Sequence, residues 1–276
     1  MSRKIAIIND ISGYGRCSTS VILPIVSHLG VQGCALPTAI FSNHTGFPSF
    51  FCKDFTEFMP AYINEWKKLD LQFDCIMTGF LGSERQINIV ELFIRDFERP
   101  QTHVLVDPVM GDNGRIYPTY TEKMCRDMRR LLAYADIITP NLTEACFLTG
   151  TRYHAENWHR AELRELSQRL LDMGARKLVI TGIHMGSNFI GNVIATQTAP
   201  EPIFQRQLQV EQTRSGTGDV FASVLAADVV NGVDFATSCR RASRFVRQCL
   251  IETIRCETAH NTGIDFESQL SKLKLR

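Results

Sequence analysis

The stretch TRSGTGDVFASVLAADVVNG, Thr213 to Gly232, joins a glycine-rich turn to a strongly patterned apolar segment. Gly216 and Gly218 allow the backbone to turn sharply and to approach a ligand closely. The apolar residues behind them recur at helical spacing, and Gly232 is a suitable C-terminal stop. A helix is therefore predicted to begin at Gly-Thr-Gly. Its free N–H groups would form an anion hole for charge that develops during a reaction.

Strand-like and helix-like runs alternate along the rest of the chain, which predicts a parallel sheet with helices on both faces, because parallel strands need crossover connections. The predicted strands are Lys4–Asn9, Gly33–Thr38, Cys75–Thr78, His103–Asp107, Asp136–Thr139 and Lys177–Thr181. The predicted helices are Ser18–Leu29, Phe55–Leu69, Arg85–Phe97, Thr121–Leu132, Thr143–Thr149, Ala161–Met173, 217–231, 235–254 and 265–273. Two further strands with no helix between them predict an antiparallel edge, Phe189–Thr196 and Ile203–Leu208. The fold class is α/β, a three-layer α/β/α sandwich with a mostly parallel central sheet, and residues 1–276 are expected to form a single domain.

Distinctive polar residues and glycines follow several of these strands. In such sheets, ligands bind outside the carboxyl ends of the strands. Each of these residues alone is compatible with ordinary turn chemistry, but together they outline one cleft. They are Asp10 and Gly13, Asp107 and Gly111, Asn141 and Glu144, and Gly182.

The first of these loops, NDISGYGRCSTS (Asn9 to Ser20), looks like a dinucleotide-binding turn with Ser18 in place of the third glycine. A dinucleotide site also needs an acidic residue about 20 positions further on. No Asp or Glu occurs from Ile11 to Lys53, so another ligand is expected at this loop. The pattern G-x-x-x-x-G-K-[ST] is absent from the sequence, which excludes a P-loop kinase.

The charge balance favours a small-molecule ligand. Thirty Lys and Arg against 29 Asp and Glu leave a net charge of +1, which gives no electrostatic reason to expect nucleic acid or an anionic membrane as partner. The N-terminus lacks a leader-like apolar core, and no apolar stretch approaches the ~20 residues that span a bilayer. The nine cysteines include no C-x-x-C pair and are expected to be reduced thiols. We therefore expect a cytoplasmic protein.

Four segments carry a resemblance to a known family: FSNHTGF (Phe41–Phe47), VDPVMGDNG (Val106–Gly114), ADIITPNLTEACFLTG (Ala135–Gly150) and SGTGDVFAS (Ser215–Ser223). The chain resembles the ribokinase superfamily and, within it, the pyridoxal/pyridoxamine kinases of vitamin B6 salvage, over nearly its whole length. G-T-G-D is shared by the superfamily, whereas S-N-H-T-G and D-P-V-M-G-D are narrower. The resemblance implies a ribokinase-like fold, a homodimer, and phosphorylation of the 5′-hydroxymethyl group of a B6 vitamer by ATP with Mg²⁺. It leaves a requirement for a monovalent cation such as K⁺ open.

The resemblance also implies roles for residues at the phosphate end of the cleft. Asp219 would be the base that takes the proton of the substrate hydroxyl, and Gly216, Thr217 and Gly218 would form the anion hole. Glu144, in the N-x-x-E formed with Asn141, would hold Mg²⁺ largely through water. Asp107 would lie near the metal and the ATP phosphates. Thr139, Asn141 and Thr181 would contribute to the nucleotide site.

The opening loop becomes the substrate end of the cleft. By resemblance, Asp10 and Thr45 would contact the pyridine ring substituents, with Gly46, Tyr14 and the base Asp219 nearby. Many relatives have Ser in place of Asp10, and a carboxylate there suits the ammonium of pyridoxamine better than the aldehyde of pyridoxal. The preferred vitamer is therefore open.

Other readings stay open beside this one. Hydroxymethylpyrimidine kinases also carry an early acidic residue and glycines, a sugar kinase would need more hydroxyl-binding groups, and a non-catalytic nucleotide- or vitamer-binding protein would be favoured if the base or metal carboxylate were missing. Asp112 to Tyr120 could cover the site or form a solvated loop. His44, which lacks ligand-spaced partners, is expected to shape its loop rather than to bind a metal.

Overall fold

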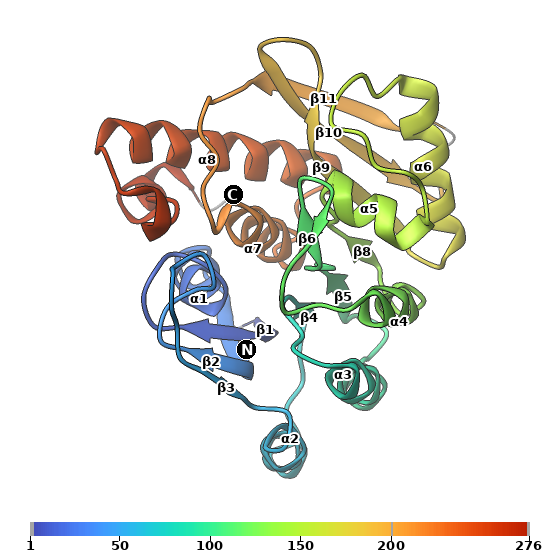
Figure 1. Ribbon diagram of the computed structural model, residues 1–276. Helices are drawn as coiled ribbons and strands as arrows, with labels where there is room; N and C mark the ends of the chain where they lie inside the picture. Colours follow the sequence, from blue (N-terminus) through green and yellow to red (C-terminus); the bar gives the residue numbers. More distant parts are fainter. Residues whose placement is uncertain (1–2, 200, 275–276) are drawn as a thin grey trace.

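Alternate side chains of the central strands enter two separate hydrophobic cores, which explains why both faces of the sheet are covered by helices. In β1 (Lys4–Ser12), Ile5 and Ile7 pack into one core, while Ala6 and Ile8 pack into the other. The helices α1, α7 and α8 cover the first face, and α2 to α6 cover the second (Figure 1). The computed structural model describes residues 3–199 and 201–274, so the ends of the predicted domain, residues 1–2 and 275–276, lie outside the described residues.

The main sheet has nine strands in the order β11-β10-β9-β8-β5-β4-β1-β2-β3. Neighbours from β9 to β2 pair in parallel, whereas β10, β11 and β3 pair antiparallel, so both edges of the sheet are antiparallel. Only the β10–β11 edge was predicted from the sequence. The other strands are β2 (Gln32–Phe41), β3 (Cys52–Asp54), β4 (Cys75–Thr78), β5 (His103–Val106), β8 (Ile137–Ile138), β9 (Lys177–His184), β10 (Phe189–Thr196) and β11 (Ile203–Leu208).

The helices begin and end close to the predicted positions. They are α1 (Thr19–His28), α2 (Met59–Lys68), α3 (Glu84–Phe97), α4 (Glu122–Leu132), α5 (Leu142–Thr149), α6 (Arg160–Asp172), α7 (Thr217–Val230) and α8 (Phe235–Arg255). The helix predicted from Phe55 begins instead at Met59. Pro60 then lies in the first turn, where the backbone N–H groups have no partner within the helix and proline is tolerated. The helix predicted over 265–273 is a short 3₁₀ helix, η2 (Glu267–Lys272), rather than an α-helix, and it follows another 3₁₀ helix, η1 (His260–Thr262).

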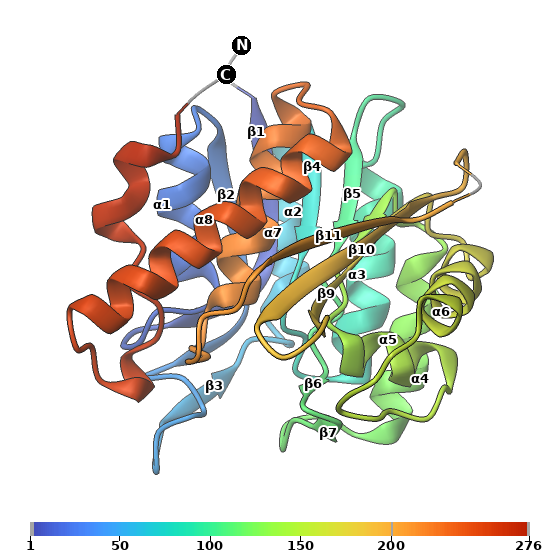
Figure 2. The same cartoon turned by 90° about the horizontal axis from the view of Figure 1, so that it is seen from above.

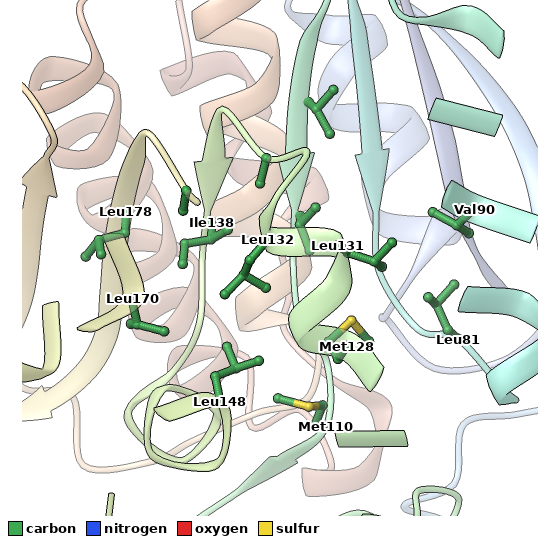
Figure 3. Close-up of a cluster of buried hydrophobic side chains, with 14 of the residues drawn as sticks. Leu81, Val90, Met110, Met128, Leu131, Leu132, Ile138, Leu148, Leu170 and Leu178 are labelled. Carbon is green, nitrogen blue, oxygen red and sulfur yellow. The ribbon is translucent and has the colours of Figure 1, made fainter. Parts of the chain in front are cut away.

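The core under the second face includes side chains from several helices and strands and from the loop after β5 (Figure 3). Leu131 and Leu132 of α4 pack there with Ile138 of β8 and Leu148 of α5. Met110, which follows β5 in a loop, is fully buried in the same core. Burial of such a side chain contributes ~1.5–3 kcal/mol, so the loop after β5 is held in place by its own apolar residue. None of the helices formed by the described residues is long and apolar enough to cross a membrane.

Candidate active site

The carboxyl ends of the central parallel strands meet the N-terminus of α7. The chain leaves β1 toward β2 on one side, while β4 pairs with β1 on the other, so the direction of winding reverses beside β1. A crevice at such a point is the usual ligand site of an open α/β sheet. Figure 2 shows α7 running alongside β1 and β4, behind α8.

Two glycines shape the N-terminus of α7 in different ways. Gly216 has φ 86°, and a Cβ there would lie 2.2 Å from the carbonyl oxygen of Arg16, so only glycine fits. A Cβ at Gly218 would meet no atom of the described residues within 4 Å outside its own helix. The first N–H groups of a helix have no partner within it. The exposed Gly218 leaves room in front of this helix N-terminus, as an anion hole requires.

Asp219 is the half-buried carboxylate of this helix N-terminus. Its Oδ2 accepts a hydrogen bond of 2.8 Å from the backbone N–H of Ser18, and its Oδ1 accepts one of 3.4 Å from the Asn9 side chain. Burial raises the pKa of Asp219 to about 7, with a further upward contribution from Asp10, while the hydrogen bonds from Ser18 and Asn9 act in the opposite direction. A carboxylate with a pKa near 7 suits a general base at neutral pH.

Asp107 and Thr139 lie side by side because β5 and β8 are parallel neighbours, with Val106 opposite Ile138. The Thr139 hydroxyl donates a 3.0 Å hydrogen bond to Oδ1 of Asp107. Burial raises the pKa of Asp107 to about 7, the charge of Asp219 adds to this, and the hydrogen bond from Thr139 lowers it. The structure therefore brings this predicted pair together, next to the proposed base.

Glu144 and Asn141 are joined by a capping box at the start of α5. The Asn141 Oδ1 accepts from the N–H of Glu144 at 3.0 Å, and Glu144 Oε2 accepts from the N–H of Asn141 at 2.8 Å. The N–H of Met110 donates to Glu144 Oε1 at 3.1 Å. Burial, and then the charge of Asp107, raise the pKa of Glu144 well above its usual range. Thr181, paired with Asn141 in an isolated bridge, joins the same group.

The segment from Asp112 to Tyr120 contains a small hairpin rather than a plain loop. Its strands are β6 (Gly111–Asp112) and β7 (Arg115–Ile116). The N–H of Gly114 donates to the Thr143 hydroxyl at 2.9 Å, and Asn141 Nδ2 donates to the carbonyl of Gly111 at 2.8 Å. These contacts fix the hairpin beside the N-terminus of α5, at the edge of the candidate site (Figure 2).

The predicted substrate end is built from two loops that cross. Asp10 follows Asn9 in β1, is 5% exposed, and accepts a 3.1 Å hydrogen bond from Ser12, while burial raises its pKa. Tyr14 and Phe47 lie 5.5 Å apart between ring centroids, and Tyr14 is exposed. Thr45 and Gly46 are exposed beside them.

His44 joins these loops to the C-terminal part of the chain. Its Nδ1 accepts from the N–H of Gly46 at 3.0 Å, and its Nε2 lies 2.7 Å from the carbonyl oxygen of Asn261. A Cβ on Gly15 would lie 2.3 Å from the His44 ring. The prediction that His44 shapes its loop is confirmed.

Asn9 and Ser18 were not predicted as site residues, although both contact Asp219. Their only signal in the sequence is position: each lies in the loop-bearing stretch after the first apolar run, without a recognisable motif of its own.

Comparisons with known proteins identify relatives of this chain by sequence and by fold. A family profile described as phosphomethylpyrimidine kinase matches residues 23–263. A pyridoxine/pyridoxal/pyridoxamine kinase of Bordetella avium is 29% identical over 258 residues, covering 89% of this chain and 84% of its own. A Bacteroides thetaiotaomicron protein provisionally named a phosphomethylpyrimidine kinase is 39% identical with a TM-score of 0.96, covering 100% of this chain and 95% of that one.

A second crystal form of the Bacteroides protein contains pyridoxal; it is 38% identical over 99% of this chain and 96% of that one, with a TM-score of 0.93. The pyridoxal kinase of Lactobacillus plantarum is 27% identical with a TM-score of 0.90, covering 99% of this chain and 96% of that one. The chain therefore belongs to the phosphomethylpyrimidine kinase family of ribokinase-like proteins, as a relative of the pyridoxal kinases.

Proposed function

We propose that this chain is an ATP-dependent kinase that transfers a phosphoryl group to the 5′-hydroxymethyl group of a vitamin B6 vitamer. The observation that carries the proposal is Asp219, a half-buried carboxylate with a pKa near 7 at the N-terminus of α7, beside the open space in front of Gly218. The relatives named for pyridoxal, and the pyridoxal bound to the Bacteroides protein, support the choice of substrate.

In this mechanism, Asp219 accepts the proton of the substrate hydroxyl while that oxygen attacks the γ-phosphorus of ATP. The bond from the γ-phosphorus to the β,γ-bridging oxygen breaks, and ADP leaves with that electron pair. The N–H groups of Gly216, Thr217 and Gly218 stabilise the negative charge on the transferred phosphoryl group. Asp219 is suited to this step because its raised pKa makes it a competent proton acceptor near pH 7.

The phosphate end of the cleft fits Mg²⁺ by its chemistry, since its carboxylates supply the oxygen ligands that this ion prefers. Both Glu144 oxygens already accept backbone N–H groups, so a contact through water suits this residue, while Asp107 would lie nearer the ion. Bound Mg²⁺ would neutralise charge on the β- and γ-phosphates. Thr139, Asn141 and Thr181 would complete the nucleotide contacts.

At the substrate end, Asp10, Tyr14, Thr45 and Gly46 would surround the pyridine ring. The buried carboxyl of Asp10 supports a preference for a vitamer with an amino substituent, because an ammonium group would pair with it.

A second candidate is hydroxymethylpyrimidine kinase activity, favoured by the description of the matching family. The test is a coupled ADP-release assay run in parallel with pyridoxal, pyridoxamine, pyridoxine and hydroxymethylpyrimidine. A specificity constant highest for a B6 vitamer supports the proposal; one highest for hydroxymethylpyrimidine would replace it with the second candidate. The same assay, with K⁺ exchanged for a bulky organic cation, decides the monovalent-cation requirement.

The proposed assembly is a cytoplasmic homodimer. All nine cysteines are free, which suits a reducing compartment. Exposed apolar side chains gather around the β3 edge of the sheet and offer a surface for a second copy: Ile40, Phe50, Phe51 and Phe58. Light scattering after gel filtration would measure the mass; a monomer at micromolar concentration contradicts the dimer.

A further inference from the structure

Asn9 is a buried amide at the carboxyl end of the central strand β1. It is 2% exposed, and the pairing of β1 with β2 shifts register between Asn9 and Ile11. Such an irregularity re-aims the side chain that precedes it and is frequent beside active sites. At this strand end, the Asn9 side chain lies between the loop after β4 and the N-terminus of α7.

Neighbouring backbone groups fix the orientation of this amide. Its Oδ1 accepts hydrogen bonds from the N–H of Phe80 at 2.8 Å and from the N–H of Asp10 at 2.9 Å. Because both of these groups are donors, the oxygen must face them, and the NH₂ group must face Asp219. Packing adds to this: a Cβ on Gly79 would lie 2.5 Å from the Asn9 amide nitrogen.

The Asp219 carboxylate is thus held by two donors from different elements. Ser18 holds Oδ2 at 2.8 Å, from a backbone with φ 55° that a non-glycine residue rarely adopts. The Asn9 amide holds Oδ1 at 3.4 Å. Oδ1 makes the weaker of the two hydrogen bonds, so it is the oxygen that can more readily accept a proton. The two hydrogen bonds together fix the plane of the carboxylate.

We propose that Asn9 is the positioning residue of the proposed base: its amide orients Asp219 so that Oδ1 faces the substrate hydroxyl. The inference rests on the proposed function, in which Asp219 accepts that proton. The charged or titratable groups around Asp219 are Asp10 from β1, Asp107 after β5, Cys17 before α1 and Tyr117 after β7. None of these is a cation, so the neutral donors Asn9 and Ser18 favour the ionised carboxylate.

Asn9→Asp removes the NH₂ group but adds a carboxyl group, so it is compared with Asn9→Ser, which removes the NH₂ group without adding charge. Asn9→Asp keeps the shape and the oxygen that accepts from Phe80 and Asp10, but places an oxygen where the donor faced Asp219. We expect kcat to fall about tenfold or more with the KM for ATP little changed, and the acid limb of the pH profile of kcat/KM to move up by about one to two pH units. Asn192→Asp is the matched control, a buried amide in β10 that donates to Ser243, and should leave the pH profile in place.

A second measurement separates this inference from the proposed function. Carbon-13 carboxyl NMR follows the titration of Asp219 without any substrate, its signal being the one lost in Asp219→Asn. An upward shift of that titration in both Asn9→Asp and the uncharged Asn9→Ser supports the inference, because the second variant adds no charge beside Asp219. This holds even if the parent phosphorylates no vitamer, a result that would overturn the proposed function alone. Should Asn9→Asp not fold, Asn9→Ser, too short to reach Asp219, is read in the same way. A parental kcat, pH profile and Asp219 titration in the folded variant would overturn the inference.

Discussion

The carboxylate of Glu144 accepts a hydrogen bond from the backbone N–H of Met110, 34 residues earlier in the chain. The same side chain caps its own helix through Asn141, so it ties the loop after β5 to the start of α5. Met110 is buried in the core, which makes this tether rigid. The segment from Asp107 to Met110 therefore carries one proposed carboxylate of the metal site, Asp107, and holds the other, Glu144, by a hydrogen bond.

Glu144→Gln is expected to raise the Mg²⁺ concentration needed for half-maximal rate. Glutamine keeps the size of the side chain and one acceptor for the N–H groups, but it removes the negative charge that attracts the hydrated ion. The rate is measured against Mg²⁺ concentration at saturating ATP and vitamer.

The matched control is Glu162→Gln. Glu162 occupies the same capping position at the start of α6, where it accepts from the N–H of His159 at 2.8 Å. This variant should keep the parental Mg²⁺ dependence. Equal Mg²⁺ curves for all three proteins would contradict a metal role for Glu144.

Asp219→Asn is expected to lower kcat by about 10²–10⁴-fold while ATP affinity, measured by calorimetry, stays close to the parent value. The parental rate should also decline as the pH falls below about 7, because the base must be ionised to accept a proton. Turnover within a few-fold of the parent rules out Asp219 as the base, and loss of ATP binding would mean that the anion hole itself was disturbed.

The same substitution is expected to stabilise the fold, increasingly so as the pH rises. The unfolded Asp219 ionises near its ordinary pKa of 3.8, whereas the folded group stays protonated until about pH 7. As the pH rises from 3.8 to about 7, ionisation of Asp219 therefore increasingly favours the unfolded chain. The loss in the free energy of unfolding reaches roughly 4 kcal/mol above pH 7 and is absent below the ordinary pKa. The Tm of Asp219→Asn minus that of the parent should be larger at pH 8 than at pH 5. A difference that does not change with pH would contradict the raised pKa.

Gly218→Ala tests the anion hole without disturbing the fold. An added methyl group meets no neighbour there and favours the helix, so Tm should not fall. The methyl group would project into the space proposed for the phosphoryl group, so kcat should fall strongly. Gly216→Ala is the counterpart: its methyl group clashes with Arg16, and both Tm and activity should drop. Full activity of folded Gly218→Ala would place the phosphoryl group elsewhere.

Asp10→Ser is expected to lower the specificity constant for pyridoxamine relative to that for pyridoxal, because it removes the carboxyl that would pair with an ammonium group. Ser12→Ala removes only the hydrogen bond to Asp10 and should change the ratio much less. The two constants are measured by ADP release for each variant. An unchanged ratio in Asp10→Ser excludes this residue from vitamer choice.

Elements with a regular apolar pattern were predictable from the sequence. The bounds of β4, β10 and β11 are those that the apolar patterns predict, and α3 begins one residue before its predicted start. The exposed strand β3 has no such pattern, since its existence depends on pairing with β2 rather than on burial. Local periodicity therefore reports packing, but not an edge contact made elsewhere in the chain.

In the candidate site, too, some residues could be predicted from local sequence and others depend on contacts made far away in the chain. Asp107 and Asn141 could be predicted because they follow strands, where chain direction alone brings them to one edge of the sheet, and Glu144 because it lies in the first turn of the helix that begins next. Asn9 could not be singled out in this way. Its partner Asp219 lies 210 residues away, and only the folded chain shows that the Asn9 amide faces it.

The place of His44 between three chain segments has a consequence for how the mouth of the cleft opens. Its ring bonds to Gly46 and Asn261 and packs against Gly15, while the N–H of Arg16 donates to the carbonyl of Thr262 at 3.0 Å. None of these three segments can move away without breaking hydrogen bonds to another of them. We therefore expect residues 13–16, 44–46 and 259–262 to exchange their amide hydrogens as one cooperative unit, so that ligand entry requires a single concerted opening.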